Sequence, residues 1–182
     1  MIGKSSFSPR EEGLIMFKIV CLAAAAVVAL SANAFAGTPV WGTNVSSCVP
    51  DNSAIQPNLY LNSAGSMGFA SGATGDVVVY CPIPTLASTP GNIQIGYIDD
   101  TATSLNHVKA QLIAMNYTTG AISTVTTIDS ANFSSSASYV SHSLSTDFTG
   151  YNPSQNAYYI RIDLVRNGTQ HETMFNVALL SP

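Results

Sequence analysis

Charged side chains are scarce in this chain of 182 residues: lysine and arginine number 6, aspartate and glutamate 10, and together they make up 9%. Ordinary soluble domains carry about a quarter charged residues. The shortage excludes a coiled coil, a helical bundle with a charged surface and a basic nucleic-acid-binding protein. Because 46% of the residues are hydrophobic, the chain can still bury a core, and disorder is not expected.

Long apolar runs are also missing. The longest, Ile19–Leu30, has twelve residues, whereas a membrane-spanning helix needs about 20. The run follows Lys18 and precedes Ala34-Phe35-Ala36, which is the order of a secretory signal peptide. We expect cleavage near Ala36, so that the mature protein is secreted to the periplasm, the cell surface or the medium without a membrane span; a retained anchor is the alternative.

Residues 1–15 match no part of a signal peptide, whereas Met16-Phe17-Lys18 is a usual beginning for one. Glu11-Glu12-Gly13 can be encoded by a purine run that resembles a bacterial ribosome-binding site. We therefore expect Met16 to be the initiator, residues 1–15 to be an upstream extension and residues 16–36 to be the signal peptide of a bacterial protein. A gene sequence without a GGAGG-like run at these codons would contradict this.

Residues 37–182 are poor in charge and rich in hydroxyl groups. Three basic residues stand against eight acidic ones, a net charge of −5, and serine and threonine number 35. Threonine suits a half-buried sheet surface and serine suits turns, so this composition is typical of an exported β-protein. The segment has the length of one domain.

Only two cysteines, Cys48 and Cys81, lie in this segment. Export places them in an oxidising compartment, and we predict a disulfide worth about 3–4 kcal/mol. A metal pair or a reactive thiol is the alternative, but neither cysteine has a C-x-x-C or nearby histidine partner.

Apolar and polar residues alternate along most of residues 37–182, without a sustained helical period. About ten strands describe an all-β, antiparallel two-sheet β-sandwich, for which immunoglobulin-like and jelly-roll topologies both remain open. The expected strands are 39–46, 57–62, 66–71, 75–82, 92–99, 107–117, 121–128, 138–145, 157–166 and 169–180.

Asn167-Gly168 is a dipeptide favoured in two-residue β-hairpins. A hairpin there would pair strand 157–166 with strand 169–180. Leu164 would lie opposite His171 on the core side, and Asp163 opposite Glu172 on the other side.

The expected Asp163–Glu172 pair is a candidate binding or acid–base site, because facing carboxylates bind Ca²⁺ or share protons. Arg161, on the same side, could neutralise them by a diagonal contact. We favour this second interpretation, a salt-bridged surface patch.

Asp99 and Asp100 end a predicted strand and are weak candidates for metal ligands, with an ordinary turn as the favoured alternative. His107, His142 and His171 lack metal-binding spacing, and there is no G-x-S-x-G motif. No cofactor and no catalytic residue are therefore predicted.

Tyrosine side chains are numerous, and we expect Tyr117, Tyr151 and Tyr159 to lie outside the core or at strand ends. Exposed tyrosines stack against sugar rings, so these three are candidate glycan-binding residues. The alternative is that they pack across strands.

Cys48-Val49-Pro50, Val78-Val79-Tyr80-Cys81-Pro82-Ile83 and the I-x-I-x-Y-x-D pattern at 93–99 resemble a group of small exported bacterial proteins of unassigned function. The resemblance covers about residues 48–180 and implies a single β-sandwich domain with one C-x-P…C-P-I disulfide. It implies no catalytic residues.

Three functions remain open. The first is a non-enzymatic exported protein that binds a surface glycan or protein, or serves as an envelope component. The second is a fimbrial subunit completed by a neighbour's strand, although residues 37–47 make a poor donor. The third is a polysaccharide hydrolase that uses Asp163 and Glu172.

Overall fold

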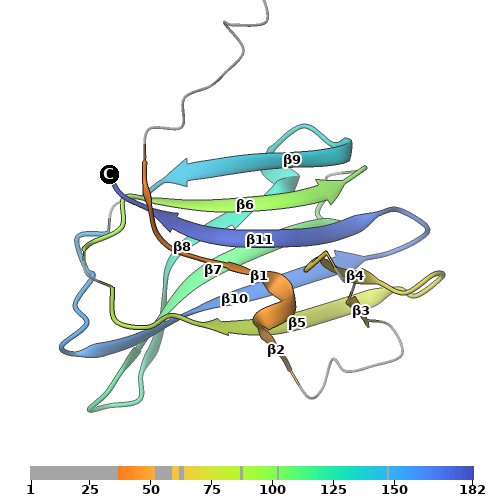
Figure 1. Cartoon of the computed structure of the whole chain (residues 1–182). Helices are drawn as coiled ribbons and strands as arrows, with labels where there is room; N and C mark the ends of the chain where they lie inside the picture. Colours follow the sequence, from red (N-terminus) through yellow and green to blue (C-terminus); the bar gives the residue numbers. More distant parts are fainter. Residues whose placement is uncertain (1–36, 52–58, 62–63, 87, 102, 147) are drawn as a thin grey trace, which may run out of the picture. The chain divides into compact units, whose positions relative to one another are not determined.

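Alternating apolar residues build nearly all of the regular structure as β-strands (Figure 1). The computed structural model describes residues 37–51, 59–61, 64–86, 88–101, 103–146 and 148–182, and residues 37–182 group into one unit. The predicted extension and signal peptide lie outside the described residues and stay predictions. Within the described ranges, no helix has the length and apolar character needed to cross a membrane.

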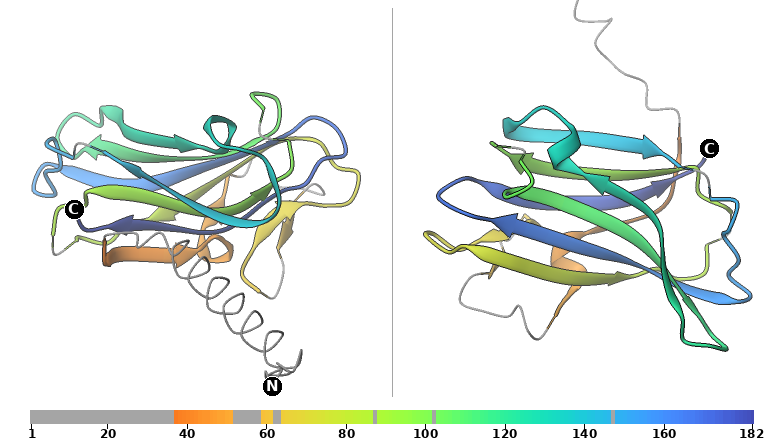
Figure 2. Two further views of the ribbon diagram at one scale, coloured as in Figure 1. Left: turned by 90° about the horizontal axis from the view of Figure 1, so that it is seen from above. Right: turned by 180° about the vertical axis from the view of Figure 1, so that it is seen from behind.

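The strands form two antiparallel sheets, which confirms the predicted sandwich (Figures 1 and 2). In order across the six-stranded sheet lie β3 (Leu59–Leu61), β4 (Met67–Phe69), β11 (Glu172–Leu180), β6 (Asn92–Asp99) and β9 (Ser136–Ser145), with β1 (Pro39–Asn44) also beside β11. The five-stranded sheet has the order β2 (Val49–Pro50), β5 (Gly75–Pro82), β10 (Asn156–Arg166), β7 (His107–Asn116) and β8 (Ile122–Asp129). Two single 3-10 turns, η1 (Val45–Ser47) and η2 (Ser130–Asn132), complete the described elements.

The pairing of the long strands is nested: β1 pairs with β11, β5 with β10, β6 with β9 and β7 with β8. This wrapping of one long hairpin over two sheets is the jelly-roll arrangement. It decides between the two topologies that the sequence leaves open. In the immunoglobulin arrangement the last two strands share a sheet, whereas here β10 and β11 belong to different sheets.

The predicted hairpin between the last two strands is therefore wrong. Leu164 lies opposite Val108 on one side and Val77 on the other, not opposite His171. Because β7 and β5 occupy both edges of β10, no edge is left for β11, and Asn167-Gly168 becomes part of a crossover between sheets. Glycine suits this connection, since Gly168 has φ of 135°.

The core follows the predicted alternation. Ile93, Ile95 and Tyr97 of β6 are completely buried, and so are Ile160 and Ile162 of β10. The predicted ranges 75–82 and 92–99 match β5 and β6 at both ends. The two-residue strand β2 was not predicted, because so short a segment carries no periodicity.

Residues 37–47 were considered as a donor strand for a neighbouring subunit, but they contain β1, which pairs within this chain's own six-stranded sheet. Trp41 and Thr43 lie opposite Leu179 and Val177 of β11. The predicted disulfide joins Cys48 to Cys81 and is confirmed.

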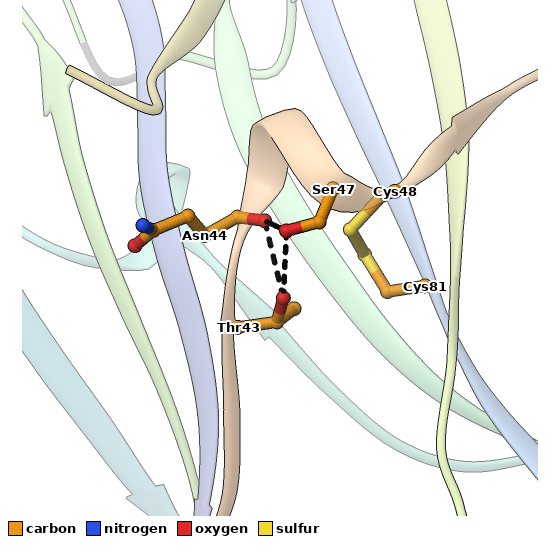
Figure 3. The surroundings of a disulfide bond; sticks show 5 residues. All are labelled: Thr43, Asn44, Ser47, Cys48 and Cys81. Atoms are coloured by element: carbon orange, nitrogen blue, oxygen red, sulfur yellow. Dashed lines mark hydrogen bonds between the residues drawn. A yellow bond between two sulfur atoms is a disulfide. The ribbon is translucent and has the colours of Figure 1, made fainter. Parts of the chain in front are cut away.

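The disulfide fastens the passage from one sheet to the other (Figure 3). After β1 the chain turns through η1, and Cys48 directly precedes β2. The hydroxyl of Ser47 donates to the carbonyl of Asn44 at 2.8 Å and lies 3.1 Å from the hydroxyl of Thr43. These contacts keep the turn tight and position Cys48 to reach Cys81 in β5.

Candidate functional site

The outer side of the five-stranded sheet carries three of the predicted site residues. Because Ile160 and Ile162 point into the core, Tyr159, Arg161 and Asp163 point outward. The register brings neighbours from the adjacent strands beside them. We call this set of outward-facing residues the polar face: Tyr80 of β5, Lys109 and Gln111 of β7, and Tyr159, Arg161 and Asp163 of β10.

Asp163 is the centre of an ion network on the polar face. Its Oδ1 accepts a hydrogen bond from Nε of Arg161 at 2.8 Å, and its Oδ2 lies 3.1 Å from Nζ of Lys109. The side chain of Asp163 is only 7% exposed, against 43% for Arg161 and 27% for Lys109. Arg161 therefore neutralises Asp163, but from the same strand and without Glu172, which is not part of the predicted patch; Lys109 is a further partner that was not predicted.

Two tyrosines stand beside this network. The rings of Tyr80 and Tyr159 lie 5.8 Å apart at 72°, an edge-to-face contact. The hydroxyl of Tyr80 donates to Oδ2 of Asp51 at 3.4 Å. Burial, followed by the charge of Asp51, raises the pKa of Tyr80. The two half-buried rings of Tyr80 and Tyr159 form an ordered pair, which we call the aromatic corner.

Outward-facing side chains of β7 and β8 cover the backbone beside the middle of the polar face. Ile113 points outward between Tyr159 and Thr124 and is only 5% exposed. Next to it, the amide of Gln111 donates to the hydroxyl of Thr127 at 3.3 Å. Neighbouring side chains therefore cover the sheet backbone and keep the polar side chains of this face in defined positions.

The other two predicted tyrosines do not join Tyr159 on this surface. Tyr151 packs on the buried Tyr158, with ring centroids 4.6 Å apart and an angle of 33°. Tyr117 is 62% exposed, and with Tyr151 it lines a small cavity of about 70 Å³ beside Pro153. The predicted tyrosines therefore lie in two places, and only Tyr159 has polar groups of the ion network next to it.

Glu172 does not face Asp163, which corrects the predicted carboxylate pair. Glu172 begins β11 in the other sheet, lies opposite Asp99 of β6 and is 2% exposed. It points into the space between the sheets, as Met174 does two residues later. Because Asp163 points outward from the five-stranded sheet, the two carboxylates form neither the calcium site nor the acid–base pair that the sequence left as alternatives.

Glu172 instead lines a cavity of about 630 Å³ at one end of the sandwich, which we call the end cavity. Nε of Arg166 lies 3.8 Å from its Oε2. Burial, followed by the charge of Asp99, raises the pKa of Glu172 to about 7, although Arg166 acts in the opposite direction. The cavity is lined by Tyr60, Phe69, Ala70, Ser71, Gly72, Arg166, Thr169, His171, Glu172 and Thr173.

Asp99 and Asp100 do not converge. Asp99 is fully buried and accepts hydrogen bonds from the hydroxyl of Ser130 and from the backbone N–H of Thr101. Asp100 accepts one from the backbone N–H of His171 at 3.1 Å. Among the described residues, no three histidine, cysteine, aspartate or glutamate side chains group as metal ligands would. These contacts favour the turn interpretation.

Tyr80, Lys109 and Gln111 of the polar face were not predicted, and among the residues that line the end cavity only Glu172 was a predicted binding residue. The alternation of Lys109 and Gln111 with buried Val108 and Ala110 was a usable signal for an outward-facing polar pair. Their position beside β10 needed the topology.

No protein-family model matches the chain, and no curated protein matches it. Among solved structures, it is similar to a carbohydrate-binding module, CBM36, in complex with calcium and xylotriose, at 13% identity and a TM-score of 0.46, covering 78% of this chain and 99% of the module. A xylan-binding module, CBM15, gives 10% identity and a TM-score of 0.46 over 78% of this chain and 96% of the module. A module specific for non-crystalline cellulose, CBM28, has 10% sequence identity and a TM-score of 0.46, covering 74% of this chain and 87% of the module.

Proposed function

We propose that residues 37–182 form an exported, non-catalytic domain that binds a saccharide chain on the polar face. The observation that carries the proposal is the placement of the Tyr80–Tyr159 aromatic corner beside the network of Arg161, Asp163 and Lys109 on one sheet surface. A sugar ring has an apolar C–H face and a rim of hydroxyl groups. An aromatic ring with donors and acceptors next to it is complementary to both.

The charges of the polar face favour a neutral saccharide. The carboxylate of Asp163 offsets one of its two cations, and Asp129 of β8, directly opposite Lys109, offsets the other, so neither sign of charge dominates its surroundings. The side chain of Arg161 is 43% exposed, and Gln111 lies opposite it on β7. These groups can hydrogen-bond to hydroxyls on either side of a ring stacked on Tyr159.

Rigidity supports binding by this face. The ion network and the bond between Gln111 and Thr127 hold long side chains that would otherwise lose conformational entropy when a ligand binds. A surface that is ordered before binding keeps more of its contact energy as affinity.

The test uses the purified protein with cellulose, xylan, chitin and soluble β-glucan, in pull-down assays followed by calorimetry on whichever binds. Tyr159→Ala should weaken binding about tenfold or more, because central aromatic contacts dominate such interfaces. Tyr139→Ala is the matched control, since Tyr139 is a half-exposed tyrosine that contacts Phe175 on the other sheet. Equal binding by wild type and Tyr159→Ala, or retention by none of the four polysaccharides, would overturn the proposal.

A further inference from the structure

The dipeptide Asn167-Gly168 forms no hairpin and takes no part in the polar face. It begins the connection from β10 to β11, residues 167–171, which carries the chain from one sheet to the other (Figure 1). Nowhere else in the 182 residues does glycine follow asparagine. Asn167 is exposed, so solvent reaches its side-chain amide.

The backbone nitrogen of Gly168 is a nucleophile next to that amide. A bond from this nitrogen to Cγ of Asn167 closes a five-membered ring, and glycine has no Cβ to block the approach. In the described part of the chain, no group accepts a hydrogen bond from the N–H of Gly168. Most backbone N–H groups are engaged in this way. The proton of Gly168 is therefore not held by a partner.

The groups on either side of the reacting atoms are held in place. The backbone N–H of Asn167 donates to Oδ1 of Asn106 at 2.7 Å. The carbonyl of Gly168 accepts from Nε of Arg166 at 3.2 Å. Gly168 has φ of 135°, a conformation in which other residues are strained. The fold thus requires glycine after Asn167 and leaves Cγ of Asn167 and the nitrogen of Gly168 without partners.

We propose that Asn167-Gly168 is a site of spontaneous covalent modification, at which Asn167 loses its side-chain amide. The Gly168 nitrogen gives its proton to a base and bonds to Cγ of Asn167. The bond from Cγ to Nδ2 breaks, and the nitrogen leaves as ammonia. Water then opens the succinimide ring. Cleavage at Cγ gives aspartate, and cleavage at the backbone carbonyl carbon gives isoaspartate, so one water is consumed for each ammonia released.

The isoaspartyl product changes the path of the backbone. The chain then runs through Cβ and Cγ and is one carbon longer between the residues. The bond from Asn167 to Asn106 and the bond from Arg166 to Gly168 cannot both keep their geometry. Arg166 is only 8% exposed, so a lost partner is not easily replaced by water. The isoaspartyl form should therefore be less stable than a form with a normal backbone.

The experiment follows the folded protein over weeks in buffers from neutral to mildly alkaline pH. Trypsin cuts after Arg166 and releases residues 167–182 as one peptide. Mass spectrometry detects the change from amide to acid, and labelling by isoaspartyl methyltransferase measures isoaspartate. We expect both products at Asn167, formed faster at higher pH because more of the backbone nitrogen is deprotonated.

Asn132 is the internal control, since it is exposed but followed by Phe133. Asn167 should react about tenfold faster than Asn132 or more, because glycine leaves its nitrogen unshielded. Asn167→Gln should stay unmodified over the same period, since its ring would need six members. Asn167→Asp carries the new charge on a normal backbone. The isoaspartyl form, separated by chromatography, should unfold at a lower urea concentration than Asn167→Asp.

The inference is overturned if Asn167 stays intact in the folded protein while protein unfolded in urea is modified, because the fold would then protect it. Aspartate without isoaspartate would indicate direct hydrolysis and exclude attack by Gly168. Equal rates at Asn132 and Asn167 would remove the role of the glycine. Equal urea stability of the isoaspartyl form and Asn167→Asp would contradict the effect on Arg166. None of these outcomes depends on saccharide binding.

Discussion

Lys109 and Asp163 lie opposite each other on neighbouring strands, and their side chains close an ion pair of 3.1 Å on the outer surface of the five-stranded sheet. The ion pair links β7 to β10 in addition to the backbone hydrogen bonds between the two strands. With Arg161 as the second cation, it makes Asp163 the residue on which the order of the polar face depends.

Replacing Asp163 by Asn should lower the free energy of unfolding by about 1–2 kcal/mol, because two cations lose their partner but can still be solvated. It should also weaken polysaccharide binding. Urea denaturation measures the first effect. Asp76→Asn is the control, because Asp76 is an exposed carboxylate on β5; equal stability of the two variants would contradict the role given to Asp163.

Glu172 should make the protein less stable as pH rises. Its pKa is about 7 in the folded protein against 4.5 for the ordinary group, so between these values the folded state binds more protons than the unfolded state. The free energy of unfolding should therefore fall from pH 4.5 to 7, by up to about 3 kcal/mol. Burial is the main cause of this raised pKa; the charges of Asp99 and Asp100 from the β6 end raise it further, and that of Arg166 from β10 lowers it.

Glu172→Gln removes this contribution and leaves the others in place. The stability of the variant relative to wild type, from denaturation at pH 5 and at pH 8, should rise with pH. A difference that is constant across this range would show that Glu172 does not titrate as its burial requires.

Breaking the disulfide should cost about 3–4 kcal/mol, because Cys48 and Cys81 are separated by 33 positions. Denaturation with and without a reductant measures the loss, and Cys48→Ser with Cys81→Ser reproduces it without a reductant. If the reduced protein is as stable as the oxidised one, the bridge does not restrict the unfolded chain as assumed.

Export is checked on protein collected from outside the cytoplasm. Mass spectrometry should find a chain that begins at Gly37 with no free thiol. An intact N-terminal segment, or free thiols on Cys48 and Cys81, would contradict the signal-peptide prediction.

The local pattern of the sequence predicted the long strands and the buried side of β6 and β10, but not that of β11, where Glu172 points inward. Ile93, Ile95 and Tyr97 alternate with polar residues, and that alternation alone places them in the core. The contact between Arg161 and Asp163 was predictable for the same reason, since residues two apart on one strand share a face.

The choice of neighbouring strand was not predictable in this way. Asn167-Gly168 has the residues of a tight hairpin, yet β10 already has partners on both edges, so the chain crosses to the other sheet. This choice is made by long-range pairing, which the local pattern does not contain. For the same reason Lys109 was missed as a partner of Asp163, and Glu172 was assigned to the wrong face.

The most direct test of saccharide binding by the polar face is an NMR titration of the isotope-labelled protein with an oligosaccharide from the polysaccharide it retains. The account predicts that the largest shifts occur at Tyr80, Lys109, Gln111, Tyr159 and Arg161. Largest shifts at Tyr139 and Asn176, on the outer side of the six-stranded sheet, would contradict it.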